Sequence, residues 1–262
     1  MNNLKNIYKI NQNRKTFIIA EACDNHYGSL NRAMQMVSKA KEIGADCIKF
    51  QHHLPDEEML SNSPMSKNFR EPLYDFLQKN ALKIEDHIKI KNFCRKKKIS
   101  YLCTPFSLKA AEQLYKIGCR DFKIGSGEMT DIPTLLKIAK FARNMIISTG
   151  MSTLSEIERT YNSLKKTKSK ISLMHCVSEY PTNYEDLNLN FINVLKKKFK
   201  NVKVGHSDHT SDIHSSVAAV AVGAEIIEKH VTIDKRFKGP DKDVSISFNE
   251  FRNMIRQIRN IE

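Results

Sequence analysis

Short runs of apolar and β-branched residues alternate along the chain with longer segments in which apolar residues recur at helical spacing. This alternation is typical of repeated strand-helix units that build a parallel sheet. Eight such units can be counted between about residue 16 and residue 258, which leaves no room for a linker. We therefore predict an α/β fold, a (β/α)8 TIM barrel in which residues 1–262 form a single domain.

The predicted strands are short apolar runs with polar carboxyl ends: residues 16–23, 46–51, 100–106, 121–127, 144–150, 172–177, 202–208 and 225–231. The predicted helices are Leu30–Ile43, Ile84–Lys98, Ser107–Ile117, Ile132–Phe141, Leu154–Leu164, Leu189–Phe199, Ile213–Val222 and Phe248–Ile258. Residues whose side chains can cap a helix start are Ser29, Ser107, Asp131, Thr153 and Ser247. Glycines expected to end helices are Gly44, Gly118 and Gly223.

The longest stretch outside this repeat, Gln51–Leu82, follows the second strand. In a parallel barrel, the segments that follow strands lie at the carboxyl ends of the strands, where barrel enzymes place their active sites. We expect this excursion to lie over the site as a lid.

The net charge of +14 raises the question of a nucleic-acid partner. The basic clusters at residues 94–98, 165–170 and 195–200 all fall at predicted helix ends, just before the next strand. That position puts them on the face opposite the expected site, where cations complement the helix dipole. We therefore expect no nucleic-acid partner.

The chain has no apolar run near the roughly 20 residues that span a bilayer, and residues 1–15 lack the apolar stretch of a secretory signal. These features predict a cytoplasmic protein with no membrane partner.

The six cysteines are scattered and include no C-x-x-C pair, which favours buried, reduced thiols over disulfides or a zinc site.

Charged and hydroxyl side chains interrupt the predicted strands at their carboxyl ends, one strand after another. Unpaired buried charges are unfavourable, so Glu21, Lys49 and Lys123 inside strand runs indicate a charged site at the barrel mouth. Further polar residues at strand ends are Gln51, Thr104, Ser126, Glu128, Ser148, Tyr180, Ser207, Glu228 and Lys229. Lysines among hydroxyls suit a phosphorylated or carboxylated substrate. The alternative for Lys49 or Lys229 is an outward position between strand and helix.

Two histidines, His209 and His230, follow adjacent strands and can reach one ion. Imidazole nitrogen suits a divalent transition metal, although two histidines are also compatible with structural hydrogen bonding. A structural role is expected for the remaining histidines considered: His52, His53, His87, His175, His206 and His214.

The strings IIAEACDNHYGSL, IKFQ, CTPFS, FKIGSGEMTDIPTL, IISTGMSTLSEI, HCVSEYPTNYEDLNL, VGHSDHT and EKHVTIDKRFKGPDKDVS resemble those of sialic acid synthases in order and spacing. The resemblance covers Phe17 to Phe251. It implies a homodimeric enzyme that binds phosphoenolpyruvate and Mn²⁺, with Mg²⁺ or Co²⁺ as alternatives. The implied reaction joins phosphoenolpyruvate to an N-acyl hexosamine aldehyde, N-acetylmannosamine or a diacetamido-trideoxyhexose, giving a nine-carbon 2-keto acid and phosphate.

The resemblance also implies roles for single residues. Phosphoenolpyruvate would be bound by Lys49, Thr104, Lys123, Ser126, Ser148 and Ser207. The metal would be bound by His209 and His230, and catalysis would involve Glu21, Lys123 and Glu128. The acceptor sugar would contact Gln51, Asn68, Glu128, Tyr180 and Asp241.

The sequence departs from the family pattern in three places, one of which is Ser211-Asp212-Ile213-His214, where small apolar residues are usual. Most members continue into a small antifreeze-like domain that caps the partner's sugar site, whereas this sequence stops at Glu262, and Cys23-Asp24-Asn25 is atypical. A separate cap-domain protein, a different or smaller acceptor, and a binding barrel without turnover all stay open. A Schiff-base aldolase that uses Lys123 or Lys49 is the other enzymatic alternative.

Overall fold

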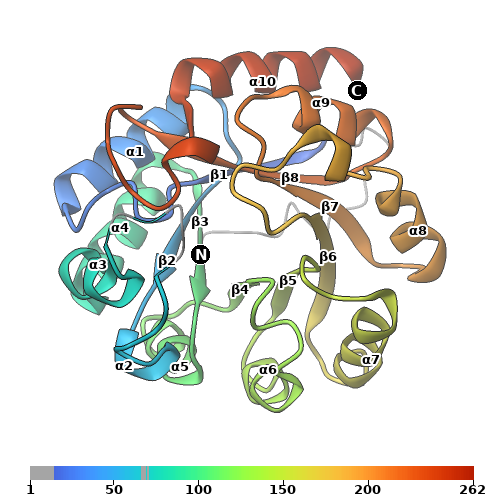
Figure 1. Ribbon diagram of the computed structural model, residues 1–262, viewed down its shortest axis with the longest axis horizontal. Helices are drawn as coiled ribbons and strands as arrows, with labels where there is room; N and C mark the ends of the chain where they lie inside the picture. The colour runs from blue at the N-terminus through green and yellow to red at the C-terminus, as the bar shows by residue number, and fades with distance from the viewer. Residues whose placement is uncertain (1–14, 66–68, 70) are drawn as a thin grey trace.

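The computed structural model describes residues 15–65, 69 and 71–262. Parallel strands follow one another in the order β3-β2-β1-β8-β7-β6-β5-β4, and contacts between β3 and β4 close the ring (Figure 1). The strands are β1 Phe17–Glu21, β2 Cys47–His52, β3 Ser100–Pro105, β4 Asp121–Ile124, β5 Asn144–Ser148, β6 Lys170–Cys176, β7 Lys203–Asp208 and β8 Ile226–Thr232. This ring confirms the predicted TIM barrel.

Helices surround the ring, and at least one helix follows each strand. The helices are α1 Leu30–Glu42, α2 Pro55–Glu58, α3 Leu73–Asn80, α4 Ile84–Lys97, α5 Leu108–Lys116, α6 Ile132–Ala139, α7 Leu154–Leu164, α8 Phe191–Lys198, α9 His214–Ala221 and α10 Phe248–Ile261. A short strand, β9 (Ile246–Ser247), pairs with β8 before α10. The 3₁₀ turns are Tyr184–Asp186 and Lys242–Val244.

The predicted helix caps are confirmed. Each of the five cap side chains accepts a backbone N–H of its helix, and Thr153 and Ser247 complete capping boxes with glutamates. The three predicted terminal glycines have φ values of 88–100°, which disfavour a residue with a β-carbon. The largest difference at a helix start is at α8, which begins at Phe191 rather than Leu189. Leu189 and Asn190 instead lie in a turn, in which the N–H groups of Phe191 and Ile192 donate to the carbonyl oxygens three residues earlier.

Alternation of side chains along the strands divides the barrel interior into two layers. The apolar layer, near the amino ends of the strands, consists of Phe17, Ile19, Cys47, Leu102, Ile146, Met174 and Ile226. Successive side chains of a strand point to opposite faces, so residues two positions further along also point inward. On β1, β2 and β8 these residues are Glu21, Lys49 and Glu228. The polar layer therefore lies on an apolar floor.

The amino-terminal part of the interior is tightly packed around Gly205 on β7. A β-carbon at this position would overlap the carbonyl oxygen of Ile226 and lie 2.5 Å from Sδ of Met174. Gly205→Ala should therefore lower the free energy of unfolding by about 1–3 kcal/mol, which chemical denaturation can measure. The control Gly127→Ala, where no described atom lies within 4 Å of the added carbon, should change it by under about 0.5 kcal/mol. Equal effects would contradict this account.

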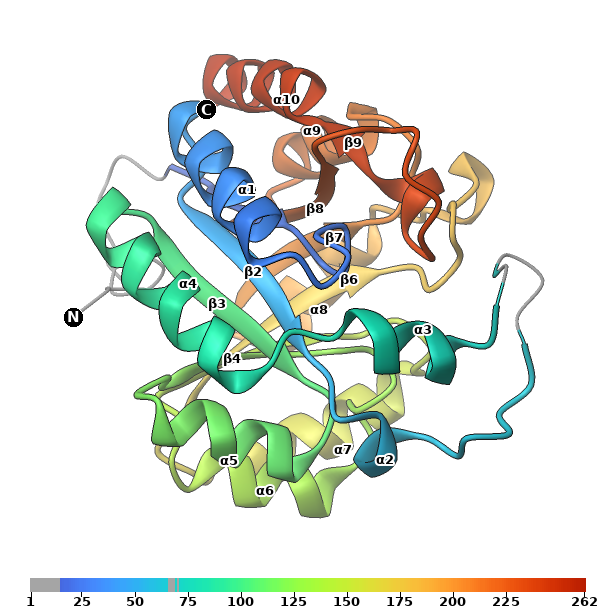
Figure 2. The ribbon, with the colours of Figure 1, turned by 90° about the vertical axis from the view of Figure 1, so that its left-hand side faces the viewer.

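The excursion after β2 contains α2 and α3 and runs along the carboxyl ends of the strands (Figure 2). The ring of Phe76 on α3 lies 6.1 Å from that of Tyr27, in the loop after β1. The predicted position of the excursion is confirmed, while its function as a lid stays a prediction.

Among the described residues, no helix is long and apolar enough to cross a membrane.

Candidate active site

Four charged side chains meet inside the barrel, directly above the apolar layer. Nζ of Lys49 lies 3.1 Å from Oε2 of Glu21 and 3.3 Å from Oε1 of Glu228. Nζ of Lys123 lies 3.2 Å from the same Glu228 oxygen. None of the four residues is more than 3% exposed. The structure thus brings together two buried cations and two buried anions from β1, β2, β4 and β8.

Hydroxyl groups complete this charged layer. Lys49 donates to Oγ1 of Thr104 over 3.2 Å, and Lys123 donates to Oγ of Ser148 over 2.7 Å. Ser207 donates to Glu228 over 2.9 Å. Among the described residues, Lys49 contacts three acceptors and Lys123 contacts two. Because an ammonium group has three donors, Lys123 keeps one for an anion.

The two carboxyl groups of this layer differ in acidity. Burial raises the pKa of Glu21 to about 7, although Lys49 opposes this effect. Burial alone would also raise the pKa of Glu228, but Lys123, Lys49 and Ser207 hold it well below its usual range. Glu228 therefore stays charged as a counter-ion for both lysines, whereas Glu21 can exchange a proton near neutral pH.

The pKa values of the two lysines are shifted in opposite directions. Burial lowers the pKa of Lys123 despite the opposing charge of Glu228. For Lys49, burial acts in the same direction but is outweighed by Glu21 and Glu228, so its pKa is raised. The stronger pairing of Lys49 leaves Lys123 as the less neutralised cation.

A second group of polar atoms lies where β4, β5 and β6 end. Oγ of Ser126 lies 3.3 Å from Sγ of Cys176. A β-carbon at Gly150 would lie 2.5 Å from Oγ of Ser178 and 2.8 Å from Oγ of Ser126. A glycine is thus needed for these side chains to gather around the backbone. The group forms a polar wall beside Ser148.

The predicted metal-binding histidines lie side by side, with ring centroids 5.4 Å apart. Nδ1 of His209 lies 2.7 Å from the carbonyl oxygen of Val177, which places the hydrogen on Nδ1 and leaves the Nε2 lone pair facing Tyr180. Nδ1 of His230 is buried without a hydrogen-bond partner among the described residues. Burial, then His209, holds the pKa of His230 well below its usual range. A neutral imidazole with an unpaired nitrogen fits a divalent cation.

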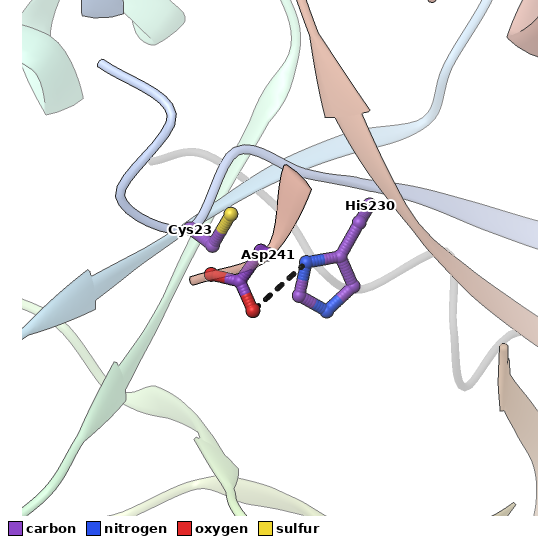
Figure 3. Close-up of side chains that lie close together, drawn as sticks. All are labelled: Cys23, His230 and Asp241. Atoms are coloured by element: carbon purple, nitrogen blue, oxygen red, sulfur yellow. Dashed lines mark ion pairs between the residues drawn. The ribbon is translucent and has the colours of Figure 1, made fainter. Parts of the chain in front are cut away.

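Asp241 and Cys23 lie near Nδ1 of His230 (Figure 3). Oδ1 of Asp241 lies 3.9 Å from Nδ1 of His230. The ligand atoms of all three residues lie within 4.8 Å of one another. Burial raises the pKa of Asp241, although the Cys23 thiol and His209 oppose this effect.

Of the remaining predicted acceptor residues, Gln51 contacts the charged layer and Tyr180 contacts a predicted metal ligand. Gln51 donates to Glu21 over 3.1 Å, and the ring of Tyr180 stacks on that of His209 at 4.2 Å. Glu128 packs against Gly125, and burial raises its pKa. Asn68 lies outside the described residues.

In and beside the charged layer, Glu228 and His53 were not predicted as site residues. Glu228 was recognised only as a polar strand residue, although its position two before His230 places it on the same inward face. His53 was expected to be structural, yet it lies 3.0 Å from Gln51 and 2.8 Å from Glu58. It therefore holds the amide that contacts Glu21.

The side chain of Lys229 lies outside the strand ring and has a structural role. His52 and His87 also have structural roles. Nζ of Lys229 lies 3.2 Å from Oδ1 of Asp208 and 2.5 Å from the carbonyl oxygen of Thr210. The outward alternative is thus correct for Lys229 and wrong for Lys49. His52 and His87 are hydrogen-bonded to Gln113 and Tyr101, each over 2.8 Å.

Comparisons with known proteins agree on one family. The sequence model of the NeuB family matches residues 36–262. The N,N'-diacetyllegionaminic acid synthase of Campylobacter jejuni is 40% identical over 259 residues, which cover 95% of this chain and 77% of the relative. A pseudaminic acid synthase of Campylobacter jejuni is 35% identical over 265 residues, covering 98% and 76%. The N-acetylneuraminic acid synthetase of Leptospira borgpetersenii, solved with citrate, superimposes with a TM-score of 0.87 at 35% identity, covering 94% and 83%.

Proposed function

The chain belongs to the NeuB family, and from this premise we propose that it condenses phosphoenolpyruvate with the open-chain aldehyde of an N-acyl amino-sugar. The products would be a nine-carbon 2-keto sugar acid and phosphate. The observation that carries this proposal is the buried layer of two lysines and three hydroxyls on an apolar floor. Such a layer suits a small, highly charged anion.

Lys123 binds the phosphate in this proposal, because it keeps a donor after contacting Ser148 and Glu228. Ser126 and Ser148 add hydroxyl donors on the same side of the barrel. Lys49 and Ser207 lie across Glu228 from Lys123, where they can contact the carboxylate. Thr104 keeps the Lys49 ammonium in place.

The bond-forming step joins the enol carbon of phosphoenolpyruvate to the aldehyde carbon of the acceptor. Water then adds to C2 of the former phosphoenolpyruvate unit, and phosphate leaves as its bond to C2 breaks. In this proposal Glu21, held by Lys49 and Gln51, accepts the proton that the water loses. Glu128, whose pKa is raised by burial, is proposed to protonate the aldehyde oxygen as it becomes a hydroxyl group.

We further propose that His209 and His230 hold a divalent cation, Mn²⁺ or alternatively Mg²⁺ or Co²⁺. A bound cation would polarise the acceptor aldehyde. Tyr180 contacts His209, Asp241 lies near His230 and Gln51 contacts Glu21. These three residues are proposed to contact the sugar. Homodimer formation, a separate cap-domain partner and a cytoplasmic location stay predictions.

Phosphate release by the purified chain tests the proposal. The assay supplies phosphoenolpyruvate, Mn²⁺ and a panel of N-acetylated hexosamines and diacetamido-trideoxyhexoses, with and without EDTA. Release that depends on one acceptor and stops with EDTA is expected. Release with no acceptor, or none with any sugar, would contradict it. Covalent trapping by borohydride in the presence of substrate would instead support the Schiff-base aldolase.

Removing either proposed metal-binding histidine should abolish metal-dependent turnover. His209→Ala and His230→Ala are each expected to lower kcat by at least about 100-fold, more than is typical for an outer partner of a metal ligand. Circular dichroism should show an unchanged fold. The control is His214→Ala, at the exposed start of α9, which should keep full activity. Full activity in a His209 or His230 variant would exclude that residue as an essential ligand.

A further inference from the structure

Three potential metal ligands of different chemistry lie together at the carboxyl end of the barrel. Cys23 follows β1, His230 lies in β8, and Asp241 precedes the 3₁₀ turn after β8. Their sulfur, nitrogen and oxygen atoms lie within 4.8 Å of one another (Figure 3). Cys23 and His230 are buried, and Asp241 is half-buried.

The imidazole of His230 offers an unused nitrogen to this centre. Its Nδ1 is buried and has no hydrogen-bond partner among the described residues, and the residue is 4% exposed. The 3.9 Å separation from Oδ1 of Asp241 is too long for a hydrogen bond. It suits two ligands of one ion, because nitrogen and oxygen ligands about 2.1 Å from a cation lie at most about 4.2 Å apart.

The position of Cys23 sets it apart from most cysteines of the chain. Cys47, Cys94, Cys103 and Cys119 belong to the apolar clusters of the barrel, whereas Cys23 belongs to neither. Cys23 also has a φ of 38°, in the left-handed region that a β-carbon disfavours. The sulfur atom of this buried thiol lies within 4.8 Å of ligand atoms of His230 and Asp241.

We propose that Cys23 is a thiolate ligand of the cation site, together with Nδ1 of His230 and a carboxylate oxygen of Asp241. The Cys23 thiol releases its proton to solvent as the sulfur-metal bond forms. One thiolate and one carboxylate, beside the imidazoles of His209 and His230, would neutralise the charge of a divalent cation. Sulfur favours Zn²⁺, Co²⁺ and Fe²⁺ over Mg²⁺ and Mn²⁺, so the site should select softer cations than a site built from imidazoles alone.

This inference deepens the proposed function, because it concerns the cation of the same site. It also gives Asp241 a second role besides the acceptor contact. The alternative is that Asp241 only orients the His230 ring while Cys23 stays protonated. Metal binding distinguishes the two without any turnover.

The test is a Co²⁺ titration of the full chain followed by absorption spectroscopy. The unmodified protein should show a sulfur-to-cobalt charge-transfer band in the near ultraviolet. Cys23→Ser should remove the band, and Cys94→Ala, which removes a thiol buried in an apolar cluster, should keep it. If Cys23→Ser fails to fold, Cys23→Gly replaces it, because glycine accepts a φ of 38°.

Competition with a chelator supplies a second measurement. Cys23→Ser should weaken Co²⁺ and Zn²⁺ binding by roughly 10- to 100-fold, a loss typical of damaged metal sites. Mn²⁺ binding should change much less, because Mn²⁺ gains little from sulfur. The inference is overturned if bound Co²⁺ gives no charge-transfer band, or if the band survives in Cys23→Ser and disappears only in Cys176→Ser.

The two proposals fail separately. An intact, Cys23-dependent band in a chain that releases no phosphate would contradict the proposed function alone. An acceptor-dependent synthase whose metal site shows no thiolate would contradict this inference alone.

Discussion

Replacing Lys123 by methionine should lower kcat/KM for phosphoenolpyruvate by roughly 100- to 1,000-fold, because truncating one partner of a buried, hydrogen-bonded charge pair in a complex typically costs about 2–5 kcal/mol. The effect should be large because Lys123 is buried and is the lysine that keeps a donor after its contacts with Ser148 and Glu228. Methionine retains most of the volume of the side chain and removes the charge. Most of the loss should appear as a raised KM for phosphoenolpyruvate, measured by initial rates of phosphate release.

The fold should survive this change, because Glu228 keeps Lys49 and Ser207 as partners. Lys137→Met is the matched control: Lys137 lies on α6, which follows the same strand, but is exposed on the outside of the barrel. It should leave the kinetics unchanged. An unchanged KM for phosphoenolpyruvate in Lys123→Met would exclude Lys123 from the phosphate site.

Glu228→Gln should produce the largest loss of stability among the charge substitutions in the barrel. The carboxylate faces both lysines at 3.2–3.3 Å, and its removal leaves two buried cations with too little counter-charge. Breaking buried pairs in this way typically costs about 3–5 kcal/mol. In a domain of this size, 1 kcal/mol corresponds to about 2–4 °C, so Tm should fall by roughly 10 °C, measurable by calorimetry.

The control for this prediction lies at the other end of the same strand segment. Glu225 pairs with Lys203 at 3.9 Å, and both side chains are partly exposed to water. Because water screens such a pair, Glu225→Gln should cost under about 1 kcal/mol. A Glu228→Gln protein as stable as Glu225→Gln would mean that the lysines are neutralised by other groups.

Much of the fold could be predicted from the sequence, because its determinants are local. Strand and helix periods depend on which face of an element is apolar, and a cap such as Thr153 needs only the N–H groups of the next turn. The start of α8 was missed because the apolar pattern does not distinguish the turn at Leu189 and Asn190 from the helix that follows it. The excursion was placed correctly because a parallel barrel allows loops after strands at one end only.

The sequence indicated which residues belong to the polar layer but not which of them pair with one another. Strand position indicated that Lys49 and Lys123 carry the site, whereas the pairing of both with Glu228 depends on how β2, β4 and β8 face one another. The specific roles of these residues came from the family resemblance. His53 gave no sign of its contact with Gln51, because both side chains could have pointed elsewhere from the end of β2.

By itself, the sequence determined the barrel, the end of the barrel that carries the chemistry and the kinds of charge found there, because apolar period, caps and side-chain alternation are properties of neighbouring residues. Only the tertiary structure decided which polar residues share a centre. Lys49 and Lys229 look alike in the sequence, but one faces inward and the other pairs with Asp208 outside the ring. Likewise, Cys23 and Asp241 meet at His230 only because closure of the ring puts β1 beside β8.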